Sequence, residues 1–264
     1  MEIFSHIDTW VALLTLTFLE IVLGIDNIIF ISITAGKLPK QKVQRATNIG
    51  LLLAMLFRIL LLLGVSYIIA MKEALFTIDL SWFQASVSGQ SLILLGGGFF
   101  LLYKSTHEIH QKVEGTKEEE KTEEKTEADK LKNSLTSVII QIVLIDIVFS
   151  FDSVLTAVGM TNGLEGALTI MIIAVVVSIL IMMIFAVPVG KFVNKHPTIQ
   201  MLALSFLILI GFMLVTESAH LSNAVIFGQP VGAIPKGYLY FAIAFSLGVE
   251  ALNMKVRKVR FRRP

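Results

Sequence analysis

The sequence predicts an all-α integral membrane protein with about seven transmembrane helices. Hydrophobic residues make up 55% of the 264 residues and charged residues only 16%, whereas soluble domains are nearer a quarter charged. Seven stretches approach the roughly 20 apolar residues that a spanning helix needs, and basic residues gather in alternate loops. These observations argue against a soluble enzyme, a DNA-binding domain and a disordered regulator, so we expect a bilayer and not a nucleic acid as partner.

Length and hydropathy place the seven helices along the chain. The third is the weakest, because it follows the semi-polar stretch DLSWFQASVSGQ and contains Gly96, Gly97 and Gly98. Around residues 75–90 we expect an interfacial segment, with Trp82 and Phe83 at the level of the lipid headgroups. The helices are predicted near residues 11–34, 47–70, 90–107, 135–158, 166–190, 199–217 and 237–254.

Loop charges predict the orientation. Lysine and arginine cluster in the loops after the first, third and fifth helices and in the C-terminal tail, whereas the alternate loops hold only Lys72 and Lys236. Since cytoplasmic loops are enriched in basic residues, we expect the N-terminus outside and the C-terminus in the cytoplasm. Residues 111–133, rich in Lys and Glu without apolar periodicity, are predicted to form a solvated cytoplasmic linker.

The chain repeats itself across this linker. EIVLGIDNII begins at Glu20 and DIVFSFDSVL begins at Asp146, so that acid aligns with acid twice at an offset of 126. The third and sixth helices match at an offset of 113. Because the matched helices cross the membrane in opposite directions, we predict an inverted three-plus-three repeat, an architecture typical of transporters. It divides the chain into residues 1–110, the linker, residues 134–220, and a seventh helix with a basic tail in residues 221–264.

Acidic residues inside the predicted spans outnumber basic ones. Arg58 is the one certain basic partner there for Glu20, Asp26, Asp146, Asp152, Glu217 and Glu250. A charge at the bilayer centre costs about 3 kcal/mol on insertion scales, so these carboxylates must face the protein interior. Their excess implies an additional positive species, either protons or a metal cation. The alternative is purely structural ion pairing, with some acids kept protonated by burial.

The donor types favour a hard divalent cation. Carboxylates with an amide oxygen suit Mg²⁺, Ca²⁺ or Mn²⁺, and the absence of cysteine excludes thiolate sites. On a straight helix Glu20 and Asp26 would face different neighbours, so a local break at Gly24 is an alternative. One metal site or two both remain open. The candidate ligands are Glu20, Asp26, Asn27, Asp146 and Asp152, and the candidate supporting or gating residues are Arg58, Ser153, Glu217 and Glu250.

Five stretches resemble the TerC family of integral membrane proteins. The paired acidic motifs are the most specific part of the resemblance, and the family's acidic positions would fall on the five candidate ligands. The family is linked to tellurium resistance, and several members act in Mn²⁺ efflux, so the resemblance implies a multi-pass exporter. The matching stretches are FLEIVLGIDNIIFISI, LLYKSTHEIH, DIVFSFDSVLTAVGM, HPTIQMLALSFLILIGFMLV and PKGYLYFAIAFSLGVEALNM.

We therefore expect a bacterial inner-membrane exporter of a divalent cation, Mn²⁺ above all, working by alternating access between the first and fourth helices. Protons are the candidate coupling ion, and no prosthetic group is expected. The main alternative is a non-transporting membrane scaffold that supports metalation of secreted proteins or resistance to tellurite and metal stress. A homo-oligomer or a secretion-machinery partner is compatible with either function. With no nucleophile triad and no phosphate loop, we do not expect an enzyme.

Overall fold

Seven long helices and a small sheet make up the computed structural model, which describes residues 6–36, 38–64, 67, 71–114, 135–161 and 163–260. The side chains of residues 23, 25, 26, 40, 152 and 257–260 also lie outside the description. The helices are α1 (Ile7–Ala35), α2 (Lys40–Leu63), α4 (Gly89–Val113), α7 (Leu135–Thr161), α8 (Ala167–Lys195), α9 (Pro197–Leu221) and α10 (Lys236–Arg260).

Within the described residues, six helices are long and apolar enough to cross a membrane. The exception is α4, which has 25 residues but a lower hydropathy because Gly, Ser and Gln interrupt its apolar run. This is the third helix, the weakest in the sequence. The architecture is therefore that of an all-α integral membrane protein that passes the membrane several times, as predicted.

Several helix ends differ from the predicted ones. α2 begins at Lys40 after Pro39 and ends at Leu63, whereas hydropathy placed the helix at residues 47–70. Its first turns are amphipathic. They bury Ala46 and Thr47, but they do not form the continuous apolar stretch by which hydropathy locates a spanning helix. α4 extends to Val113, so the predicted linker begins inside a helix. The rest of the linker, residues 115–133, lies outside the described part of the chain.

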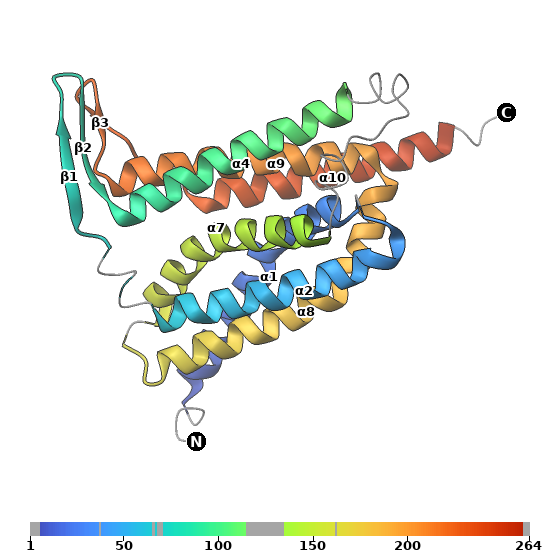
Figure 1. Cartoon of the computed structure of the whole chain (residues 1–264), viewed down its shortest axis with the longest axis horizontal. Helices are drawn as coiled ribbons and strands as arrows, with labels where there is room; N and C mark the ends of the chain where they lie inside the picture. Colours follow the sequence, from blue (N-terminus) through green and yellow to red (C-terminus); the bar gives the residue numbers. More distant parts are fainter. Residues whose placement is uncertain are drawn as a thin grey trace.

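Helix pairing brings the two halves of the chain together. α1 packs on α8, and α2 packs on α7. α4 lies along α9 (Figure 1), where a Cβ atom at Gly98 would come within 2.8 Å of the Gly211 carbonyl oxygen and one at Gly211 within 3.0 Å of the Gly98 carbonyl oxygen. Gly98 and Gly211 align in the repeat, so α4 and α9 are corresponding helices of the two halves. If the halves were interchanged, each of these helices would take the place of the other and the contact would be preserved. The inverted repeat remains a prediction that this packing favours.

A four-stranded antiparallel sheet lies at the end of the bundle opposite the C-terminus (Figure 1). β1 (Ala74–Asp79) and β2 (Phe83–Ser88) form a hairpin in the segment predicted to be interfacial. β3 (Val225–Ile226) pairs with β2, and β4 (Gln229–Pro230) pairs with β3. The sheet thus joins the connection before α4 to the connection after α9, and it holds together the sheet-side ends of that helix pair.

Candidate functional site

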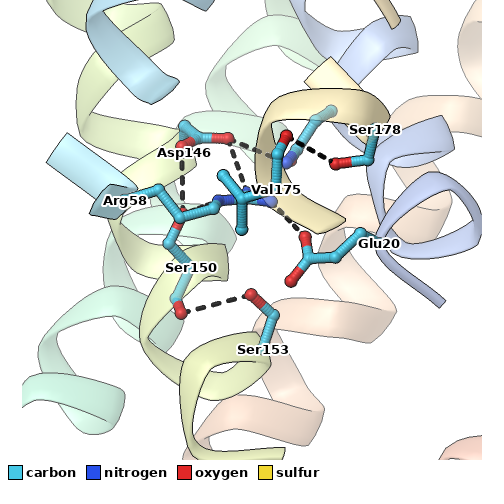
Figure 2. Close-up of polar contacts among 8 residues, drawn as sticks. Glu20, Arg58, Asp146, Ser150, Ser153, Val175 and Ser178 are labelled. Atoms are coloured by element: carbon cyan, nitrogen blue, oxygen red, sulfur yellow. Dashed lines mark hydrogen bonds and ion pairs between the residues drawn. The ribbon is translucent and has the colours of Figure 1, made fainter. Parts of the chain in front are cut away.

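A buried ionic cluster lies where α1, α2 and α7 meet (Figure 2). Arg58 of α2 is only 2% exposed. Its Nη1 donates to Glu20 Oε2 of α1, and its Nη2 donates to Asp146 Oδ1 of α7 at 2.9 Å. One guanidinium therefore links the two acids that align in the repeat. An arginine suits this role because its planar group offers several donors in a fixed geometry.

Neighbouring side chains complete the hydrogen bonding of Asp146. Ser150, one turn later on α7, accepts from Arg58 Nε at 2.8 Å and donates to Asp146 Oδ2 at 3.0 Å. Asn27 Nδ2 donates to Asp146 Oδ1 at 3.3 Å. Both carboxylate oxygens of Asp146 are thus occupied, which is what burial of a charged group requires. Ser150 is not among the predicted site residues, although its spacing of four residues from Asp146 is a helical neighbour relation.

Glu20, Asp146 and Arg58 do not balance in charge. Arginine is always protonated in proteins, so two ionised carboxylates leave one negative charge in excess. The three groups are all buried, and burial of an uncompensated charge is strongly unfavourable. With both carboxylates ionised, the cluster is therefore a buried place between the helices where a further positive charge would be stabilised.

A cavity of about 60 Å³ adjoins this cluster. It extends toward α9 and α10, and its volume is sufficient for several water molecules. Asn27 is 2% exposed, and its Oδ1 atom has no hydrogen-bond partner among the described residues. An amide oxygen in this state is available to a water molecule or a cation. The polar residues that line the cavity are Asn27, Arg58, Ser153, Glu217, Lys236 and Tyr240.

The predicted site residues are only partly brought together. Glu20, Asn27 and Asp146 lie in or beside the ionic cluster, whereas the side chains of Asp26 and Asp152 lie outside the described part of the structure. α1 continues as a helix through Gly24, so the alternative of a break there is wrong. A Cβ at Gly24 would come within 2.2 Å of the Met182 sulfur of α8, which indicates close packing of two unbroken helices.

The candidate gating residues occupy different places. Arg58 is central to the cluster, and Ser153, whose Oγ donates to the Ser150 carbonyl at 3.3 Å, lines the cavity together with Glu217. Glu250 lies elsewhere on α10, where it accepts from Thr198 Oγ1 at 2.6 Å. Among the described side chains, no group of three or more His, Cys, Asp or Glu residues is arranged to hold a metal ion.

The whole chain resembles one known family. Residues 5–264 match the family described as "Integral membrane protein TerC family". The chain belongs to the TerC family. A UPF0053 protein of Haemophilus influenzae is 44% identical to this TerC protein over 252 residues, covering 96% of both chains.

Two further TerC relatives come from Escherichia coli. The UPF0053 inner membrane protein YgdQ is 44% identical over 247 residues, covering 94% of this chain and 93% of YgdQ. The UPF0053 protein YegH is 44% identical over 253 residues, covering 96% of this chain but only 43% of YegH. No solved structure matches the chain.

Proposed function

We propose that this protein exports a divalent cation, Mn²⁺ in the first place, by alternating access at the Glu20–Asp146 cluster. The observation that carries the proposal is the sharing of one buried guanidinium by two carboxylates beside a polar cavity. The excess negative charge favours a cation. Carboxylate and amide oxygens are donors that Mn²⁺, Mg²⁺ and Ca²⁺ accept, and the family resemblance favours Mn²⁺ among them.

The oxygen donors come from both halves of the chain. Glu20 and Asn27 lie on α1, and Asp146 lies on α7. A cation held between these helices would be released when the halves move relative to each other, as in transporters with inverted repeats. The cavity adjoins the cluster on the side of α9 and α10, which makes it a candidate path for the ion.

Export needs a source of energy. Moving one elementary charge against 100 mV takes about 2.3 kcal/mol, so a divalent ion takes roughly 4–5 kcal/mol. Protons are the coupling ion we propose, because a carboxylate that releases a metal can bind a proton.

The test is cation flux in proteoliposomes that contain the purified protein. Mn²⁺, Mg²⁺, Ca²⁺ and Zn²⁺ would be compared with and without a pH gradient. We expect Mn²⁺ flux in the wild type, its loss in Glu20→Gln and Asp146→Asn, and its retention in the matched control Glu165→Gln, an exposed acid between α7 and α8. Absence of flux for every cation in a correctly folded protein would refute the transporter and favour the scaffold function instead.

The orientation of the chain in the membrane can be tested by cysteine labelling, because the chain contains no cysteine of its own. Single cysteines at Glu114, after α4, and Glu165, before α8, would lie at opposite ends of the bundle (Figure 1). We expect a membrane-impermeant thiol reagent applied to intact cells to label Glu165→Cys and not Glu114→Cys. The reverse pattern would place the C-terminus outside the cytoplasm and would contradict the orientation predicted from the loop charges.

A further inference from the structure

We propose that Arg58 is a tethered counter-cation that occupies the site in place of the transported ion and must turn away when that ion binds. This inference rests on the proposed function and concerns how its site is regulated. All three nitrogen atoms of the guanidinium donate hydrogen bonds, to Glu20, Asp146 and Ser150. In this state, Arg58 engages an oxygen atom of each carboxylate. A cation would need the same oxygen atoms.

Arg58 and a divalent ion cannot share these carboxylates. Both positive charges would lie within a few ångströms of each other in a buried region, where repulsion is only weakly screened. Moreover, each oxygen lone pair directed at a guanidinium hydrogen is unavailable to a metal. Binding of the ion to Glu20 and Asp146 therefore requires that the guanidinium leaves, although its side chain stays attached to α2.

The cavity provides room and a second partner for the displaced guanidinium. Arg58 lines this cavity, and so does Glu217 of α9. Within the described part of the chain, Glu217 has no ion pair. The other described charged group in the cavity is Lys236, whose ammonium donates to Thr156 Oγ1 of α7 at 3.2 Å. Among the described residues that line the cavity, Glu217 is thus the carboxylate toward which the displaced guanidinium would turn.

This arrangement would couple ion release to return of the arginine. In the empty protein, Arg58 would compensate one of the two negative charges and hold α1 and α7 together. In the loaded protein, the ion would do both, and Arg58 would pair with Glu217. The arginine thus weakens ion binding, since the ion must compete with it, and speeds release for the same reason.

Binding and flux together test the proposal. Mn²⁺ affinity would be measured by calorimetry on the purified full-length protein, and flux in proteoliposomes, for the wild type, Arg58→Gln, Arg58→Lys and Glu217→Gln. We expect Arg58→Gln to lower the Kd for Mn²⁺ by about tenfold or more while slowing turnover, and Arg58→Lys to fall between it and the wild type. We expect Glu217→Gln to raise the Kd by about threefold, since the displaced arginine loses its partner.

A double variant makes the test specific. If Glu217 acts through Arg58, Glu217→Gln should change the Kd in the wild type but not in Arg58→Gln. An equal effect in both backgrounds, or an unchanged or higher Kd in Arg58→Gln, would overturn the proposal. Should Arg58→Gln fail to fold, Arg58→Lys and Glu217→Gln decide, and a normal Kd in both would overturn it. Failure of the wild type to bind or transport any cation would instead refute the proposed function.

Discussion

The two halves of the molecule share a scaffold but differ in the chemistry at its centre. At an offset of 120 residues, the buried positions of α2 from Gly50 to Leu62 fall on buried positions of α8. Arg58 then falls on Ser178, which is also fully buried. The other buried positions that correspond are Gly50 with Ile170, Leu51 with Met171, Ala54 with Ala174 and Leu62 with Met182.

The difference lies in the helix partner as well. Arg58 donates to Ser150 of α7, and Ser150 aligns with Gly24 of α1 in the repeat. Among the described residues, Ser178 donates to its own helix, at the Val175 carbonyl at 2.9 Å (Figure 2). The pair formed by α2 and α7 therefore supplies a cation and its hydroxyl partner, whereas the corresponding pair of α8 and α1 supplies two small residues, Ser178 and Gly24. A single arginine between two carboxylates leaves the net negative charge on which the proposed cation site rests.

Moving the arginine from α2 to the corresponding position of α8 should have the largest effect on stability. Arg58→Ser should lower the free energy of unfolding by about 3–5 kcal/mol, the usual cost of removing one partner of a buried ion pair. If Ser178 is the equivalent position, the double variant Arg58→Ser, Ser178→Arg should recover much of this loss. Thermal unfolding in detergent measures both, with Ser178→Ala as a nearly neutral control. A double variant no more stable than Arg58→Ser would show that the positions are not equivalent.

A methyl group at the crossing of α4 and α9 should have the next largest effect. In Gly98→Ala the new Cβ would press on a backbone carbonyl, and overpacking of this kind costs up to about 3 kcal/mol. Gly96→Ala is the matched control, because no atom lies within 4 Å of a Cβ there. We expect a lower melting temperature for Gly98→Ala alone. Equal stability of the two variants would contradict the close contact between the halves.

The contrast between these two sites shows how far the sequence alone leads. Hydropathy locates the helices because each must present about 20 apolar residues to lipid. Charged residues within such apolar segments then identify Glu20, Arg58 and Asp146. The sheet was missed, since Gln84 pairs with Val225 and no local pattern specifies so distant a partner. The orphaned oxygen of Asn27 likewise depends on how three helices pack, which the sequence does not state.

Removal of the Ser150 hydroxyl would make α7 resemble α1 at this position, where α1 has no hydroxyl. Ser150→Ala deletes one hydrogen bond to Arg58 and one to Asp146. Hydrogen bonds to charged groups contribute roughly 1.5–3 kcal/mol, so we expect a loss of about 2 kcal/mol in unfolding free energy and slower Mn²⁺ flux. Ser205→Ala is the control, because that exposed hydroxyl bonds only its own helix, at Met201. Unchanged stability in Ser150→Ala would show that the hydroxyl does not support the ion pair.

Glu250 provides the smallest expected effect and separates the ionic cluster from other acids in the helices. It is only half-buried on α10, and its partners include Thr198 and Asn253. Exposed or half-exposed polar contacts of this kind contribute about 1 kcal/mol or less. Glu250→Ala should therefore lower stability slightly and leave Mn²⁺ flux within about twofold of the wild type. A loss of flux as large as that of Asp146→Asn would mean that α10 carries part of the ion path. The cation pathway would then extend beyond the ionic cluster.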